Sequence, residues 1–392
     1  MDAMEPLPSS VLPTGVRSRI LPGINGLDIH VLEAGFETPA GGKPRPAVLL
    51  LHGFPELAFS WRKQLPALAA AGYHAIAPDQ RGYGRTTGWS ADFDADLSSF
   101  RFMMLLREAI GVLYALGHRT AEAVVGHDFG AGAASFHALV RPDIFKRMVL
   151  MSAPFGGPPA VPFDTDGKPA APKPADFHAA LAALPRPRKH YQWYQSTREA
   201  NGNQWHAKQG VHDFLRAYYH HKSADWKANK PYELKGWIAE ELAKMPTYYI
   251  MDLAEGMAET VAKEMPSAAE IAACGWLTEH ELGIYAAEYQ RTGFQGGLLW
   301  YRCRTAANFA SELQLFSGLK IEVPALFIAG RSDWGVYQNP GAFEAMQTRA
   351  CTQLQGCHLI DGAGHWVQQE QPEAVNRLLL GFLRNNQVAV LA

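Results

Sequence analysis

The sequence predicts an α/β protein with a mostly parallel sheet covered by helices on both faces and interrupted by one long helical insertion. Short, continuous apolar runs such as PAVLLLHG (46–53) suit strands that are buried on both faces of a parallel sheet. Helical stretches separate several of these runs, as in layered α/β proteins. This alternation stops at about Phe155 and resumes only near Pro324.

The first expected element is a β-rich segment at 19–35. Within it, Asn25-Gly26 is a strong hairpin turn signal between two runs in which apolar and polar residues alternate. We expect this hairpin to open the sheet. A helix is expected at 99–117, where apolar residues recur at helical spacing. Further strands are expected at 46–53, 74–79, 122–128, 147–154 and 324–330.

The interruption begins with a segment rich in Pro and Gly (156–176), followed by aromatic-rich helical sequence. It is too long and too apolar to be a loop. We interpret 156–304 as a helical cap domain between a first core part, 1–155, and a second core part, 305–392. The cap is expected over the carboxyl ends of the strands, where open α/β sheets bind ligands.

The chain has 392 residues, with 36 basic and 38 acidic side chains and a net charge of −2. This balance gives no broad electrostatic case for a nucleic acid or an anionic membrane, and it favours a neutral small substrate. No secretion signal and no run of about 18 apolar residues is evident, so a cytoplasmic protein is expected. Four cysteines without CxxC spacing predict buried free thiols: Cys274, Cys303, Cys351 and Cys357.

A candidate nucleophile stands in GHDFGA (126–131), between an apolar strand and a helical stretch. A strand, a sharp turn flanked by small residues and a helix form a nucleophile elbow, and Asp128 occupies the bend. An Asp at a helix start can instead be an N-cap, but Gly126, Gly130 and Ala131 favour the elbow. His127 should point away from the Asp128 side chain and pack as a structural residue.

His365, in the Gly-rich turn GAGHW, is the candidate general base. Asp333 follows the strand ALFIAG, from which it can orient the imidazole and stabilise its protonated form. Asp361 is the alternative, but it lies only four residues before His365. A partner for the far ring nitrogen should approach from a neighbouring strand end, which favours Asp333.

Four motifs give the chain a resemblance to the epoxide hydrolase branch of the α/β-hydrolase fold. They are HGFPE with the following SWRKQ (52–64), DQRGYGRT (79–86), GHDFGA, and GAGHWVQQEQP (362–372). The order of nucleophile, acid and His also matches α/β-hydrolase triads. The resemblance implies a cis Pro55 and an oxyanion hole built from the backbone N–H groups of Phe54 and Phe129.

The same resemblance extends to two cap motifs, RKHYQWYQS (188–196) with Tyr191 and GFQGGLLWYR (293–302) with Tyr301. Tyr194 lies close enough to Tyr191 to be confused with it. A phenol, with a pKa near ~10, stays protonated at neutral pH and can protonate the oxygen of an opening epoxide. Phe54, Phe129, Trp193 and Tyr194 are expected to contact the substrate.

A carboxylate at the elbow implies attack on a saturated carbon to give an alkyl ester, which water then hydrolyses at its carbonyl. Haloalkane dehalogenases commonly place a halide-binding Asn at position 54 and a Trp at position 129. Phe at both positions cannot donate to a halide. The sequence therefore favours an epoxide hydrolase without cofactor, acting on a small-molecule epoxide and water. The alternatives are a haloalkane or haloacid dehalogenase and a non-catalytic ligand-binding protein.

A metal site is not expected, because the adjacent His220 and His221 cannot face one ion from a helix. The remaining cap tryptophans are expected mostly to pack the cap, with only a subset lining a pocket. They are Trp205, Trp226, Trp237 and Trp276.

Overall fold

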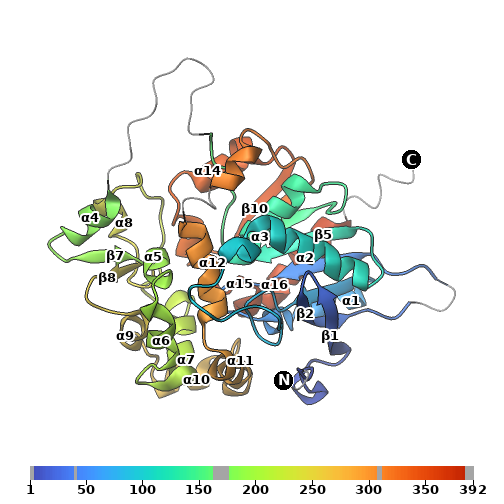
Figure 1. Ribbon diagram of the computed structural model, residues 1–392, viewed down its shortest axis with the longest axis horizontal. Helices are drawn as coiled ribbons and strands as arrows, with labels where there is room; N and C mark the ends of the chain where they lie inside the picture. Colours follow the sequence, from blue (N-terminus) through green and yellow to red (C-terminus); the bar gives the residue numbers. More distant parts are fainter. Residues whose placement is uncertain (1–3, 39–41, 162–175, 307–310, 385–392) are drawn as a thin grey trace.

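A computed structural model describes residues 4–38, 42–161, 176–306 and 311–384 (Figure 1). In this part of the chain an eight-stranded sheet has the order β1-β2-β4-β3-β5-β6-β9-β10. Its strands β1 and β2 are antiparallel to their neighbours, and the others are parallel. The strands are β1 (Val16–Ile24), β2 (Leu27–Ala34), β3 (Ala47–Leu51), β4 (His74–Pro78), β5 (Ala121–His127), β6 (Met148–Met151), β9 (Ala325–Gly330) and β10 (Leu354–Ile360).

The predicted hairpin is confirmed at the start of the sheet. Asn25 and Gly26 have positive φ angles of 52° and 80°, and Ile24 pairs with Leu27 across the turn. Asn and Gly tolerate this left-handed conformation better than other residues, and two such residues make the tight turn that joins twisted antiparallel strands.

Both faces of the sheet are buried, as the continuous apolar runs predict. Along β3, Val48 and Leu50 belong to one hydrophobic cluster and Leu49 and Leu51 to the other. Helices α1 (Leu65–Ala70) and α16 (Pro372–Arg384) pack in the first cluster, whereas most buried side chains of α2 (Phe102–Ala115) and α3 (Phe129–Val140) lie in the second. The predicted helix at 99–117 is therefore confirmed as α2, although the backbone at Arg101 is extended.

The long insertion between β6 and β9 is mainly helical, as predicted, and its residues 162–175 lie outside the described part of the chain. It also contains a small antiparallel pair, β7 with β8, that the sequence did not predict. Its elements are α4 (Phe177–Ala182), β7 (Arg188–His190), α5 (Tyr191–Gln195), α6 (Glu199–Trp205), α7 (Gly210–Lys222), α8 (Ala239–Leu242), β8 (Ile250–Asp252), α9 (Met257–Ala262), α10 (Ala268–Ala273), α11 (Glu279–Thr292) and α12 (Gln295–Thr305).

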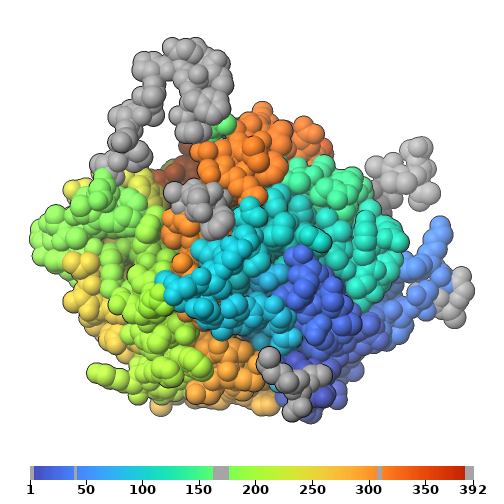
Figure 2. Space-filling model, viewed as in Figure 1, coloured from blue at the N-terminus to red at the C-terminus, as the bar shows by residue number. Residues whose placement is uncertain are grey.

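The insertion packs directly against the loops that follow β3 and β4. The Tyr219 hydroxyl donates to the Pro55 carbonyl at 3.0 Å, and the Trp300 indole donates to the Arg81 carbonyl at 2.8 Å. Figure 2 shows the insertion, in green to yellow, in close contact with the core in blue to cyan. The insertion therefore lies over the carboxyl ends of the strands, as expected.

Two short helices follow β9, namely α14 (Ala342–Ala345) and α15 (Val367–Glu370). The strand β10 was not predicted. It lies at the edge of the sheet, and most of its residues are half-exposed, so it lacks the continuous apolar run of a central strand.

The turn between β5 and α3 depends on two glycines that bring backbones into close contact. A Cβ atom at Gly126 would lie 2.0 Å from the Gly130 carbonyl oxygen, and one at Gly130 would lie 2.1 Å from the Leu51 carbonyl oxygen. No larger residue fits either position without moving the main chain, so α3 can approach β3 and β5 only with glycines here.

We predict that Gly130→Ala lowers the free energy of unfolding by ~2 kcal/mol or more, because the added methyl group would overlap the main chain of β3. The control is Gly283→Ala in α11, where a Cβ meets nothing within 4 Å. That change should raise stability by up to about 1 kcal/mol, since Ala favours helix. Urea unfolding followed by circular dichroism measures both. Equal effects at the two positions would contradict the steric account.

Candidate active site

Asp128 occupies the bend between β5 and α3 with φ 54° and ψ −117°. A positive φ is costly for a residue with a side chain and persists where the surrounding structure imposes it. The carboxylate makes no capping hydrogen bond to α3, and its Oδ1 instead accepts from the Phe54 N–H at 3.1 Å. The side chain is therefore held toward the loop after β3 rather than used as a helix cap.

His365 lies beside Asp128, with 3.6 Å between its Nε2 and the Asp128 Oδ2. On the other side of the ring, Nδ1 lies 3.2 Å from the Asp333 Oδ1 and 2.8 Å from the Ser152 Oγ. Asp361 has an exposed side chain that pairs with Arg331. The fold thus brings Asp128, His365 and Asp333 together and leaves Asp361 outside.

The two carboxylates at His365 are buried but favour the ionised form. Burial alone would raise the pKa of Asp128, but His365, Lys222 and His127 hold it well below its usual range. For Asp333, burial is likewise outweighed, and His365, Ser152 and the Gly335 N–H lower its pKa. Asp128 is therefore ready to act as a nucleophile without a base to deprotonate it.

His127 is fully buried, and both of its ring nitrogens have partners other than the Asp128 carboxylate. Its Nδ1 lies 2.5 Å from the Glu56 Oε2, and its Nε2 donates to the His365 carbonyl at 2.7 Å. Burial alone would lower the pKa of His127, but the Glu56 carboxylate raises it to about 8. Glu56 also accepts from the side chains of Gln368 and Gln369. The network supports the backbone of His365.

The tyrosines Tyr191 and Tyr301 come from α5 and α12 and lie side by side, with ring centroids 5.8 Å apart. The Tyr191 hydroxyl donates to the Gln338 Oε1 at 3.0 Å and accepts from the Gln192 side chain. Tyr301 packs edge-on against Phe54 and against Phe129. For both phenols, burial and the negative charge of Asp128 raise the pKa, so they stay protonated as hydrogen-bond donors.

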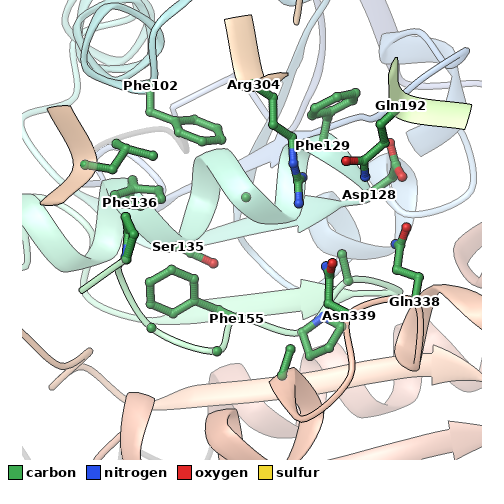
Figure 3. Close-up of a pocket in the computed structure, with 18 of the residues that line it drawn as sticks. Phe102, Asp128, Phe129, Ser135, Phe136, Phe155, Gln192, Arg304, Gln338 and Asn339 are labelled. Atoms are coloured by element: carbon green, nitrogen blue, oxygen red, sulfur yellow. The ribbon is translucent and has the colours of Figure 1, made fainter. Parts of the chain in front are cut away.

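A cavity of about 610 Å³ opens at Asp128, a size typical of small-molecule sites. Figure 3 shows Asp128, Phe129 and Gln192 at one end and Phe102, Phe136 and Phe155 along the wall. Tyr191 and Trp300 also line it. Tyr301 and Phe54 are not among the lining residues.

The expectation that Trp193 and Tyr194 contact the substrate is not supported by this cavity, since neither lines it. The helix α5 turns their side chains to other neighbours. Trp193 packs edge-on against Phe177, and the ring of Tyr194 lies under the Lys189 ammonium at 4.6 Å. None of the other cap tryptophans named above, Trp205, Trp226, Trp237 and Trp276, lines the cavity either.

The implied oxyanion hole has one donor in contact with Asp128, the Phe54 N–H. Among the described residues no hydrogen bond joins the Phe129 N–H to that carboxylate, although Phe129 begins α3. The Phe54-Pro55 peptide bond is cis, as the resemblance implied.

The four cysteines are free thiols, as predicted, with Cys303 and Cys351 buried and Cys274 and Cys357 half-buried. In the described ranges no group of three or more His, Cys, Asp or Glu side chains could hold a metal ion. His221 packs edge-on against Trp226 and Tyr248. No helix within the described residues has the length and apolar character needed to cross a membrane.

Comparisons with known proteins agree with this geometry. The model of the alpha/beta hydrolase fold family matches residues 46–372. Epoxide hydrolase B from Mycobacterium tuberculosis is 34% identical over 366 residues, which cover 86% of this chain and 91% of that protein. The chain belongs to the epoxide hydrolase family.

Further family members are equally similar along their whole length. Epoxide hydrolase A from the same bacterium is 33% identical, with 94% of this chain and 98% of that protein covered. The solved structure of an epoxide hydrolase from an endophytic Streptomyces has a TM-score of 0.74 and 30% identity, covering 96% of this chain and 97% of its own.

Sequence reasoning missed Ser152 and Lys222, which no motif marks. Ser152 follows β6 with φ 69°, an unusual conformation that only the structure reveals. Lys222 ends α7, and its carbonyl accepts from the His365 N–H at 2.9 Å. Its ammonium lies 4.8 Å from the ring centroid of Tyr249 and makes no hydrogen bond or ion pair among the described residues. Only its position three and four residues after the tyrosines of AYYHHK, and so on the same side of a helix, could have signalled a buried cation.

The buried Lys222 should make stability depend on pH. Burial lowers its pKa from the ordinary 10.5 to about 8, although Asp128, Asp333 and Glu56 oppose this shift. Between these two pH values the unfolded chain binds more protons than the folded one, so the free energy of unfolding should rise with pH. Lys222→Met should remove this rise.

The measurement is the difference in unfolding free energy between wild type and Lys222→Met, followed from about pH 7 to about pH 10 across the window set by the two pKa values. Tyrosine ionisation affects both proteins and cancels in the difference. Lys320→Met, at an exposed position, serves as the control. If the difference for Lys222→Met stayed constant over this range, burial would not lower the pKa of Lys222 in the folded protein.

Proposed function

We propose that this protein hydrolyses an epoxide to a vicinal diol through a covalent ester on Asp128. The observation that carries the proposal is the Asp128 carboxylate, held at a strained turn 3.6 Å from the His365 imidazole. The epoxide hydrolases found by comparison over most of the chain add independent support.

In the first step an Asp128 oxygen attacks one carbon of the epoxide, and the ring C–O bond breaks. The departing oxygen stays attached to the substrate and takes a proton from Tyr191 or Tyr301. The raised pKa values of these phenols keep both of them protonated until the epoxide ring opens. The product of this step is an alkyl ester of Asp128 that carries a neighbouring hydroxyl group.

In the second step His365 removes a proton from water, and the resulting hydroxide attacks the ester carbonyl carbon. Asp333 stabilises the imidazolium through Nδ1–H. The Phe54 N–H, 3.1 Å from the Asp128 Oδ1, suits the oxygen that becomes negative in this step. Collapse of the intermediate breaks the ester bond, and the departing alkoxide takes the proton from His365 and leaves as the diol. The acid proton then left on Asp128 passes to the tyrosine phenolate formed in the first step, which restores the carboxylate and the phenol.

The dehalogenase alternative is weaker because a departing halide needs hydrogen-bond donors. The Phe54 ring packs edge-on against Tyr218 and Tyr301, and neither Phe54 nor Phe129 carries a donor in its side chain. The paired phenols suit an oxygen leaving group. Release of halide from haloalkanes, without diol from epoxides, would reverse this ranking.

We further propose that residues 156–304 form the cap domain, between core parts 1–155 and 305–392, and that the protein acts in the cytoplasm without a cofactor. The Tyr191 and Tyr301 donors lie within the proposed cap, whereas Asp128, Asp333 and His365 lie within the core. Substrate would therefore react between the two parts.

The covalent route predicts the origin of the new oxygen in the diol. A single turnover with excess enzyme in water labelled with heavy oxygen should give mostly unlabelled diol, because the new C–O bond contains a carboxylate oxygen of Asp128. The label should appear in the Asp128 peptide by mass spectrometry. Labelled diol in the first turnover would instead mean that water attacks the epoxide directly.

The two phenols should both contribute to ring opening. Tyr301→Phe and Tyr191→Phe each remove a hydroxyl with little change in packing, and each should slow ester formation by ~10²-fold, as for a lost general acid. Tyr194→Phe is the matched control from the same helix and should leave the rate near wild type. Rapid-quench measurement of the ester gives these rates. If Tyr194→Phe formed the ester slowly and Tyr191→Phe formed it at the wild-type rate, Tyr194 would replace Tyr191 as the proposed proton donor.

A further inference from the structure

The cavity at Asp128 carries more positive charge than the chain as a whole. Apart from Asp128, its charged lining residues are Arg101, Arg304, Arg349 and Glu312. Arg101 pairs with Glu312 at 3.1 Å. With the Asp128 carboxylate counted, three arginines against two carboxylates leave one positive charge in the cavity, whereas the whole chain has a net charge of −2. A local positive field in a cleft attracts anions whatever the total charge.

Arg304 is the arginine best placed to use this field. It lies in the last turn of α12, three residues after Tyr301 and therefore near it on the helix surface. In Figure 3 its side chain extends into the cavity, with the guanidinium between the aromatic wall and Asn339. Among the described residues it makes no hydrogen bond or ion pair, so its donors are free for a ligand.

Its neighbour Arg302 shows the contrast within the same helix. Arg302 donates to the Phe93 carbonyl, and its guanidinium lies 4.0 Å from the centre of the Phe93 ring. The Arg302 guanidinium is thus already bound to Phe93 and contributes to the packing of α12. Arg304 has no such role.

The cavity wall on the far side of Arg304 from Asp128 is mainly apolar (Figure 3). Phe102 and Phe136 stack with ring centroids 5.0 Å apart, and Phe136 meets Phe155 edge-on. A ligand that fills this cavity therefore needs an apolar body, a reactive group at Asp128 and a negative group at the arginines. A carboxylate matches the forked donors of a guanidinium.

We propose that the substrate is an epoxide that carries a carboxylate, which pairs with Arg304 while the epoxide ring reaches Asp128 and the remaining apolar part of the molecule lies along the phenylalanine wall. This inference rests on the proposed function and names the substrate class for the same site. It replaces the neutral substrate expected from net charge, because the local charge of the cavity decides what binds there.

The test compares ω-epoxyalkanoates of increasing chain length with their primary amides, which keep the epoxide and chain but lack the charge. Wild-type enzyme should show a higher kcat/KM for the acid than for the amide at the best chain length. Arg304→Met should lower kcat/KM for the acid by about tenfold, the low end for a hydrogen bond between charged groups, since Arg304 is exposed. The amide should be affected little.

Arg119→Met removes the same charge from an exposed position that does not line the cavity, and it should leave the preference for the acid unchanged. High salt should weaken the preference in wild type more than in Arg304→Met, because the pair is screened. Circular dichroism and the Tm establish that each variant is folded.

Equal kcat/KM for acid and amide at every chain length would overturn the inference, and so would an unchanged preference for the acid in Arg304→Met. In either case diol formation from the amide would leave the proposed function intact. If no epoxide, charged or neutral, yielded a diol, the proposed function itself would fail.

Discussion

The site depends first on the close backbone contact among β5, α3 and β3. Gly126 and Gly130 allow this contact because a Cβ atom at either position would overlap a carbonyl group. The tight turn fixes Asp128 at a positive φ and directs its carboxylate toward the Phe54 N–H on the adjacent loop. The geometry of Asp128, the proposed nucleophile, is thus imposed by the packing of the sheet and does not rely on a flexible side chain.

Charge balance is the second requirement, because the carboxylates of Asp128, Asp333 and Glu56 are buried together. Removing such groups from water is costly unless nearby positive charges and hydrogen bonds compensate. His127 and Lys222 supply that compensation. Each also bonds to the main chain of His365, because the His127 ring donates to the His365 carbonyl and the Lys222 carbonyl accepts from the His365 N–H. The same two residues therefore stabilise the buried charges and position His365, the proposed base.

The three central residues of the candidate site could be proposed from the sequence. Asp128, Asp333 and His365 each lie in a turn near a strand end, where the local pattern and the topology agree. The hairpin and central strands were predictable for the same local reasons. The edge strand β10 was not, since its half-exposed residues lack a continuous apolar run. Lys222 and the lining role of Arg304 were missed because both depend on contacts between distant parts of the chain.

The contact between Gly82 and Gly296 has a consequence for how small molecules enter and leave. A Cβ atom at Gly296 would lie 1.9 Å from the Gly82 carbonyl oxygen, so α12 rests directly on the main chain of the loop after β4. Swinging α12 away as a hinged lid would break this contact and the buried Trp300–Arg81 hydrogen bond, and it would expose apolar surface to water. Exchange of reactant and product is therefore easiest through the existing opening of the cavity, with α12 held in place on the loop after β4.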